Sequence, residues 1–136
     1  MLRNSILKVG IAPFEEIKKR TLAIARGEYK PGKNEPKVWF SSMESLAQVL
    51  SSKNKLLLEI IVQAKPESVT ELAKISGRHK SNLSRTLKTL ANYGMVKLAH
   101  LKNGKIKPRV QFKTVHVDFD LQKTAHVDFD FQKKAS

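Results

Sequence analysis

Alternating apolar positions near the N-terminus predict a short strand, and a helix is expected directly after it. Within residues 5–11, Leu7, Val9 and Ile11 stand at alternate positions, which is typical of a half-buried strand. Apolar residues then recur at helical spacing from Pro13, which favours a first helical turn, up to Gly27, a common helix terminator. Residues 28–37 contain Pro31, Gly32 and Pro36 and are expected to form a linker.

Two helices are expected in the next part of the chain. Ser42 is placed to cap a helix that continues to Leu50, with Glu44 near its positive N-terminal end. Asn54 is a plausible cap for a second helix, which Pro66 ends. The predicted buried stripe of this second helix consists of Leu56, Leu57, Ile60, Ile61 and Ala64.

A pair of helices with a very short connection follows. Ser68 and Glu71 have the spacing of a capping box, in which each side chain binds a free backbone N–H at a helix start. The helix that they open is expected over residues 69–75. Gly77 breaks it, and only the short turn of residues 77–80 leads to a longer helix predicted over residues 81–92. This spacing is typical of a helix-turn-helix.

A β-hairpin is predicted after the second helix of this pair. Gly94 ends the helix, and residues 95–101 and 106–112 have the composition of two strands. Asn103-Gly104 between them favours a two-residue type I′ turn. Pro108 weakens the pairing of the second strand and indicates a sheet edge. A basic hairpin in this position is typical of a winged helix-turn-helix.

The C-terminal tail contains a repeat. His116-Val117-Asp118-Phe119-Asp120 recurs ten residues later as His126-Val127-Asp128-Phe129-Asp130. Each copy alternates apolar and polar residues, so two short strands are expected, and residues 122–124 could join them in a hairpin. The tail could alternatively bind a divalent metal through its His and Asp residues, bind the basic surface of a neighbouring subunit, or restrain DNA binding by mimicking phosphate.

The positive charge of the chain is concentrated in the same segment as the helix pair. The 136 residues carry 26 Lys and Arg against 12 Asp and Glu, giving +14 and a pI of about 10.2. Residues 65–113 alone hold 12 basic and two acidic side chains. Such a composition favours a polyanionic partner, and nucleic acid is the first candidate.

The buried side of the second helix fixes which of its residues are exposed. Leu83, Leu87 and Leu90 share one face and are expected in the core. Arg can bind guanine and Asn can bind adenine through two hydrogen bonds each, and Ser can contact bases or phosphates. The residues expected on the DNA-binding face and just before the helix are Arg78, His79, Lys80, Ser81, Asn82, Ser84, Arg85, Lys88 and Thr89.

The predicted hairpin adds basic residues that are expected to contact phosphates or the adjacent minor groove. These residues are Lys102, Lys105, Lys107 and Arg109. A structural alternative exists for both sets: a solvated basic helix face, and a polar hairpin tip that prevents edge-to-edge pairing. The order of capping box, Gly turn, polar helix and basic hairpin favours DNA binding.

The helix pair also resembles a known family. Glu71-Leu72-Ala73, Gly77-Arg78, residues 81–87 (SNLSRTL) and Tyr93-Gly94-Met95-Val96 are similar to MarR-type winged helix-turn-helix regulators. The resemblance covers roughly residues 40–113. The whole chain, including Gly27-Glu28-Tyr29 and residues 38–42 (VWFSS), is most similar to a little-characterised prokaryotic group of predicted transcriptional regulators, some of which are thought to be antitoxins.

The resemblance implies a homodimer on a pseudo-palindromic operator, with Ser81, Asn82 and Arg85 as recognition-helix positions. MarR proteins usually dimerise through long terminal helices, whereas this tail alternates like a strand. The dimer geometry is therefore not transferable, and strand exchange through the tail repeat or residues 5–11 is a hypothesis.

We expect an α+β protein in three parts. A winged helix-turn-helix DNA-binding domain over residues 40–113 follows an N-terminal strand–helix element and linker over residues 1–39. A duplicated β-strand tail over residues 114–136 completes it and could serve dimerisation or partner binding. The predicted function is a sequence-specific, double-stranded DNA-binding transcription regulator, with autorepression as its leading form.

Other functional classes fit less well. An antitoxin that represses its operon and binds a cognate toxin is the main alternative, followed by a nonspecific nucleoid or RNA-binding protein. The chain lacks Cys, so thiolate catalysis and Cys-ligated zinc are excluded, and no phosphate-binding Gly-rich loop or catalytic triad is recognisable. We expect no enzyme activity, cofactor or metal. Without a signal peptide or a run of about 20 apolar residues, a cytoplasmic, non-membrane protein is expected.

Overall fold

The computed structural model describes residues 5–121, and the second copy of the tail repeat lies outside these residues. The protein has an α+β fold, as the sequence predicts, and its described residues group into two compact units. We call residues 47–113 the helical unit and residues 6–46 with 114–121 the sheet unit. The two are described separately.

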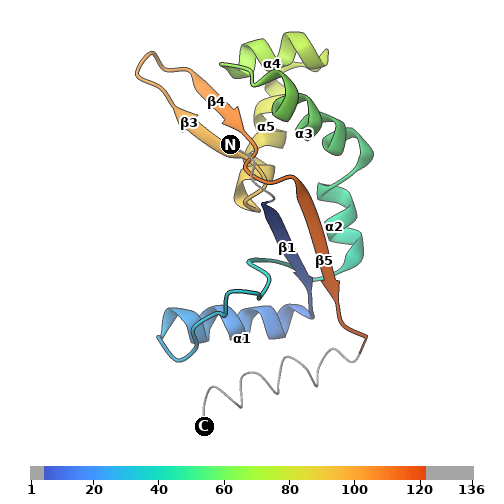
Figure 1. Ribbon diagram of the computed structural model, residues 1–136, viewed down its shortest axis with the longest axis vertical. Helices are drawn as coiled ribbons and strands as arrows, with labels where there is room; N and C mark the ends of the chain where they lie inside the picture. The colour runs from blue at the N-terminus through green and yellow to red at the C-terminus, as the bar shows by residue number, and fades with distance from the viewer. Residues whose placement is uncertain (1–4, 122–136) are drawn as a thin grey trace. The chain divides into compact units, whose positions relative to one another are not determined.

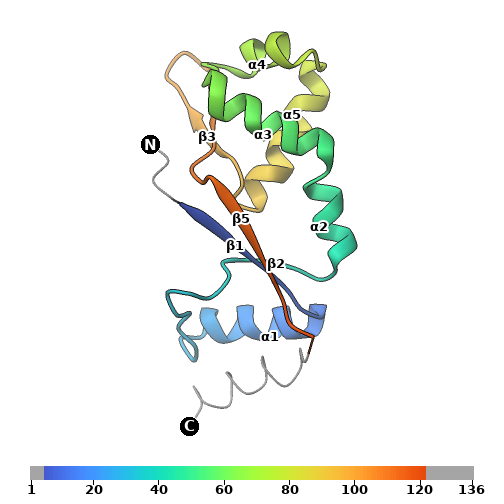
Figure 2. The same ribbon diagram turned by 45° about the vertical axis from the view of Figure 1, so that its right-hand side comes forward.

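The helical unit contains three helices followed by a β-hairpin (Figure 1). Its elements are α3 (Ser52–Ala64), α4 (Val69–Ser76), α5 (Lys80–Asn92), β3 (Lys97–His100) and β4 (Ile106–Arg109). The helix α2 (Met43–Val49) precedes them in the chain. The strands β3 and β4 pair antiparallel, with Leu98 opposite Pro108. The hairpin projects beside the three helices in both views (Figures 1 and 2).

Apolar side chains from all three helices and from the residues that flank the hairpin strands form the core of this unit. Less than a tenth of each of these side chains is exposed, and burial of this apolar surface is the main favourable contribution to folding. They are Leu57, Leu58, Ile61, Val69, Leu72, Leu83, Leu87, Leu90, Met95, Val96 and Val110.

The start of α3 differs from the prediction. Ser51, not Asn54, is its N-cap, and the Ser51 Oγ accepts a hydrogen bond of 3.2 Å from the Asn54 backbone N–H. The Asn54 amide side chain instead donates to the Val49 carbonyl oxygen at 2.9 Å. The predicted burial of Leu56 is also wrong, because that side chain is 56% exposed and Leu58 occupies the buried face instead.

The predicted type I′ turn of the hairpin is wrong as well. Such a turn needs a positive φ at both central residues, but only Gly104 has one, with φ +82°. The Gly104 N–H donates to the Leu101 carbonyl oxygen at 3.0 Å, and the Leu101 N–H donates to the Lys105 carbonyl oxygen at 2.8 Å. The connection is therefore a three-residue loop, in which the Asn103 side chain accepts a hydrogen bond from the Lys105 N–H.

The sheet unit contains three parallel strands and the helix between the first two (Figure 2). Its elements are β1 (Ile6–Ile11), α1 (Phe14–Ala25), β2 (Val38–Phe40) and β5 (Thr114–Phe119), in the sheet order β2-β1-β5. The predicted N-terminal strand and helix are thus confirmed, and so is the first strand of the tail. The short strand β2 was not predicted.

One face of this sheet carries an aromatic residue over a glycine. Gly10 lies opposite Trp39, whose indole N–H donates to the Pro36 carbonyl oxygen at 3.1 Å. The Arg20 guanidinium of α1 lies 5.1 Å from the centroid of the Trp39 ring, within cation–π range. A Cβ atom at position 10 would come within 2.5 Å of the indole ring, so only glycine fits there.

We therefore predict that Gly10→Ala destabilises the protein by about 1 to 3 kcal/mol, since the added methyl must push the indole out of a fixed position. Thermal unfolding followed by circular dichroism measures the effect. In a Trp39→Phe background the ring that the methyl meets is smaller, and the cost of the same substitution should fall. An equal cost in both backgrounds would show that the indole contact is not its cause.

A half-buried carboxylate organises the loop before β2. The Glu35 carboxylate accepts hydrogen bonds from the Tyr29 hydroxyl, from the Gly32 N–H at 2.6 Å and from the Arg20 guanidinium at 3.3 Å. Burial by itself raises the pKa of Glu35, but these hydrogen bonds and the charge of Arg20 outweigh it. The net result is a pKa below the ordinary value of 4.5.

A lowered pKa in the folded state makes this carboxylate stabilising at neutral pH. Its contribution is complete above the unfolded-state pKa near 4.5 and is lost as the pH falls through the lower folded-state pKa. Glu35→Gln should therefore cost about 1 to 3 kcal/mol at neutral pH, and less in acid. Urea unfolding of both proteins at about pH 7 and about pH 3 tests this. A difference that does not shrink in acid contradicts the assigned charge.

Candidate nucleic-acid interface

The helix α5 has a fully buried side and a fully polar side. Leu83, Leu87 and Leu90 each have no exposed surface, which confirms the predicted core stripe. The helix packs with this stripe against α4 and β3. Because the leucines fix the rotation of the helix about its axis, the opposite side chains must face solvent.

The solvent side of α5 is rich in hydrogen-bond donors and has no acidic residue. Arg85 and Lys88 supply the positive charge, and Thr89 donates from its hydroxyl to the Arg85 carbonyl oxygen at 3.3 Å. We call this set the α5 face. Its members are all exposed and comprise His79, Lys80, Ser81, Asn82, Ser84, Arg85, Lys88 and Thr89.

The N-terminus of α5 adds backbone donors to this face. His79 is the N-cap residue, and its side chain makes no capping hydrogen bond. No acidic residue lies in the first turn to offset the positive end of the helix dipole. Free N–H groups at such an end are suited to bind an anion such as a phosphate.

The helix before it is held in place by its own caps. The Ser68 Oγ accepts a hydrogen bond of 3.1 Å from the Glu71 N–H, which confirms Ser68 as the cap that opens α4. At the other end, Gly77 adopts the left-handed conformation with φ +74°. The Gly77 N–H donates to the Ala73 carbonyl oxygen at 2.9 Å, closing α4 three residues before α5 begins.

Arg78 is not part of the α5 face. Its guanidinium donates to the Asn54 Oδ1 at 3.5 Å and to the Thr86 Oγ1 at 3.2 Å, and the residue is half-buried. It therefore links the start of α3 to α5 and helps orient both. The sequence contains the partners but no local signal that they meet, because 24 residues separate Arg78 from Asn54.

The basic residues of the hairpin divide into two groups. Lys102 and Lys105 are exposed in the loop, whereas Lys107 is half-buried on β4. Arg109 at the end of β4 donates to the carbonyl oxygens of Pro66 at 2.6 Å and Pro108 at 2.7 Å. It also forms an ion pair of 3.3 Å with Glu67, so its guanidinium fixes the hairpin to the connection between α3 and α4.

One basic residue of the hairpin was missed. Lys97 on β3 is exposed and lies opposite Arg109 in the strand register, on the same face as Lys107. The pairing register of the hairpin sets the position of Lys97. Because the turn was predicted incorrectly, the sequence did not provide this register.

The charge is distributed very unequally between the two units. Residues 47–113 carry 14 Lys and Arg against three Glu, and two of those Glu form ion pairs with Lys55 and Arg109. Residues 6–46 and 114–121 together carry eight basic and seven acidic side chains. The helical unit therefore accounts for nearly all the excess positive charge of the described residues.

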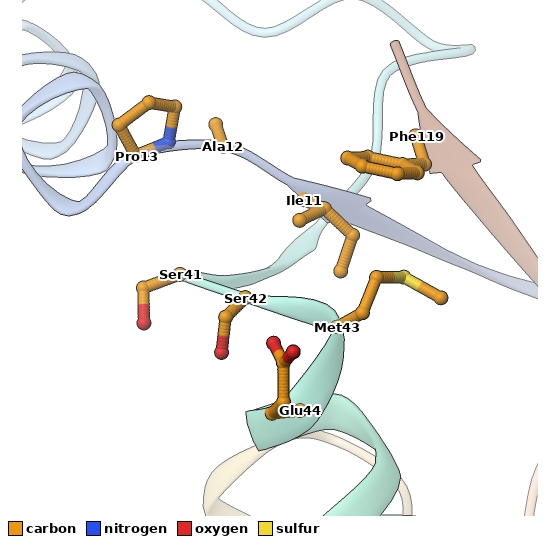
Figure 3. A pocket seen from close by; sticks show the side chains of 8 residues that line it. All are labelled: Ile11, Ala12, Pro13, Ser41, Ser42, Met43, Glu44 and Phe119. Atoms are coloured by element: carbon orange, nitrogen blue, oxygen red, sulfur yellow. The ribbon is translucent and has the colours of Figure 1, made fainter. Parts of the chain in front are cut away.

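The sheet unit has a shallow pocket of about 430 Å³ at the carboxyl ends of its strands. Figure 3 shows Phe119 and Met43 on either side of Ile11, with two serines and a carboxylate at the other wall. The eight lining residues are Ile11, Ala12, Pro13, Ser41, Ser42, Met43, Glu44 and Phe119. They include no histidine, lysine or arginine, and Glu44 is their single ionisable residue.

Two further observations concern residues 5–121. No group of three His, Cys, Asp or Glu side chains in this part of the chain is arranged to hold a metal ion, His116, Asp118 and Asp120 included. None of its helices is long and apolar enough to cross a bilayer.

A segment of the chain that contains α5 matches a known family model. The family model HVO_A0114 matches residues 49–117, which is half of the chain. The chain belongs to the HVO_A0114 family. No curated protein matches it. The region shared with the HVO_A0114 family contains α3, α4, α5 and the β3–β4 hairpin, and it ends at Val117 within β5.

Proposed function

We propose that this HVO_A0114 protein is a sequence-specific regulator of transcription that binds double-stranded DNA through a MarR-like winged helix-turn-helix. The α5 face carries the proposal: a row of exposed Arg, Asn and Ser side chains opposite a fully buried leucine stripe. The succession of α3, α4, α5 and a basic hairpin supports the winged arrangement.

Base selection is assigned to Asn82 and Arg85. Both are exposed on the first two turns of α5, the part of a recognition helix that enters the major groove. Arg85 would donate two hydrogen bonds to guanine, and Asn82 would donate to and accept from adenine. Ser81 and Ser84 would contact bases or the adjacent phosphates.

Affinity is assigned to the positive charge around this helix. Lys80 and the free N–H groups at the start of α5 would hold one phosphate, and Lys102 and Lys105 of the hairpin loop would hold others. Binding through phosphates releases counterions and weakens as salt rises. Arg78 and Arg109 act indirectly, because their guanidinium groups orient α5 and the hairpin.

We further propose that the protein acts in the cytoplasm, as an autorepressor and a homodimer. A two-fold dimer presents two copies of α5, which suits a pseudo-palindromic operator. No step of this function calls on catalysis or a cofactor.

Backbone amide shifts measured by NMR test the proposed interface. The ¹⁵N-labelled protein is titrated with a duplex from the region upstream of its own coding sequence. Shift changes should concentrate in residues 79–89 and 102–105. Changes confined to residues 6–46, with none in α5, would contradict the proposal.

A further inference from the structure

The outer edge of β5 lacks most of the features that keep an edge strand from pairing with another chain. In the order β2-β1-β5, β5 is an edge strand, and no strand of residues 5–121 pairs with its outer side. Edge strands normally carry Lys, Pro or bulges that prevent pairing with another chain. Thr114–Phe119 has no Lys, Pro or bulge, and Asp118 is its one carboxylate. The strand pairs with β1 over six regular positions.

Apolar side chains project from the same strand into solvent. Val117 is 43% exposed and Phe119 53%, although their neighbours Val9 and Ile11 on β1 are buried. The following residue on this side, Leu121, is 87% exposed. The apolar surface of the sheet therefore continues to the unpaired edge without a polar border.

We propose that β5 pairs antiparallel with β5 of a second copy of this chain, about a two-fold axis at Val117. The two three-stranded sheets then form one continuous six-stranded sheet. A two-fold interface of this kind is closed, because the β5 edge of each copy pairs with that of the other and β5 has no unpaired side left. The strand β2 of each copy forms an outer edge of the six-stranded sheet. This pairing does not depend on DNA binding, although it would supply the dimer that an operator with two half-sites needs.

Charge complementarity selects the register. Centred on Val117, the pairing places His116 of each copy opposite Asp118 of the other, twice by symmetry. The imidazole can donate a hydrogen bond to the carboxylate in either protonation state. On the other face, Val115 of each copy lies opposite Phe119 of the other, an aromatic–β-branched pair of the stabilising kind.

The neighbouring registers are less favourable. Directly opposite side chains must lie on the same face of the sheet, so the two-fold axis has to pass through a residue of β5. The nearest alternatives to Val117 are therefore axes at His116 and at Asp118. Centring on Asp118 places two carboxylates against each other at the axis. Centring on His116 places two imidazoles there and leaves each Asp118 opposite Thr114. Only the Val117 register places an imidazole opposite each Asp118 carboxylate without placing two like side chains of this polar face together at the axis.

The position of Asp118 within its own sheet supports this register. Its partner on β1 is Gly10, which has no side chain, whereas His116 lies opposite Lys8. The strand β1 therefore places no side chain directly across from the Asp118 carboxylate. A donor from a strand on the outer side of β5 would lie directly across from it.

Single charge substitutions in the full-length chain test the proposal by sedimentation equilibrium. The wild type should be dimeric. His116→Asp should raise the dimer dissociation constant about tenfold, because two attractive cross-strand pairs become repulsive. The protomer should keep its fold, since the new carboxylate faces Lys8, and its melting temperature provides the check. Adding Asp118→His should restore the wild-type dissociation constant by exchanging the charges.

The second copy of the repeat provides a matched control. His126→Asp makes the same change in an identical five-residue sequence, and it should leave the dissociation constant unchanged. An equal loss from His126→Asp would assign the pairing to the second copy and overturn the proposal. A wild-type chain that remains monomeric at about 100 μM, or failure of the charge exchange to restore the dimer, would overturn it too. A half-site duplex bound with unchanged base preference by His116→Asp would show that DNA binding is independent of this edge.

Discussion

Arg85→Ala should weaken binding to the operator by about 1 to 3 kcal/mol, which is roughly a tenfold to hundredfold loss, and should relax the base preference at one position. Arg85 is exposed on α5, with the buried leucine stripe on the opposite side. Its removal should therefore delete the proposed base contact without disturbing the fold. Fluorescence anisotropy with the operator and with single-base variants of it measures both effects.

Lys105→Ala is the matched control for this prediction. Lys105 is exposed in the hairpin loop and is assigned to a phosphate, so its loss should weaken all duplexes similarly and reduce the salt dependence. If Arg85→Ala also weakened all duplexes to the same degree, with no change in base preference, α5 would not be the reading element.

Leu87→Ala should destabilise the helical unit by about 2 to 5 kcal/mol. Leu87 has no exposed surface and lies between Leu83 and Leu90 in the stripe that packs α5 against its neighbours. Truncation removes buried methyl groups and leaves a cavity that rigid neighbours cannot fill. Because domains are stable by only about 5 to 15 kcal/mol, this single change should remove a large part of the total.

Urea unfolding followed by circular dichroism measures this loss. Lys88→Ala provides the control, since the adjacent side chain is exposed and its removal should change stability by no more than about 0.5 kcal/mol. A loss below about 1 kcal/mol for Leu87→Ala would mean that the stripe is not tightly packed.

Local sequence signals predicted the helical unit well. The spacing of Leu83, Leu87 and Leu90 identified the buried side of α5, and the Ser68 capping pattern identified the start of α4. Both signals act over a few residues, so they do not depend on the rest of the fold. The errors at Ser51 and in the hairpin loop are shifts of a few residues, where several polar residues compete for a cap or turn position.

The sheet unit could be predicted only in part, because its pairing joins distant residues. The strands β1 and β5 were both expected from alternation, but nothing local shows that residues 6–11 pair in parallel with residues 114–119. The strand β2 is only three residues long, too short to show a period. Gly10 became informative only when the structure brought Trp39 over it.

Long-range contacts also give two of the predicted site residues a role within the protein. Arg78 and Arg109 were predicted to contact DNA, and the guanidinium groups of both donate hydrogen bonds to oxygen atoms of the helical unit. A basic residue on a surface and one that fixes two elements look alike in sequence. The exposed members of the α5 face remain the residues proposed to read DNA.

The most direct test of sequence-specific DNA binding is fluorescence anisotropy with the duplex upstream of the protein's own coding sequence, against a scrambled duplex of equal composition, at several salt concentrations. At physiological salt, the native duplex should bind about a thousandfold or more tightly than the scrambled one. Equal affinity for both duplexes, falling together as salt rises, would contradict autoregulation through this site and indicate binding to phosphates alone.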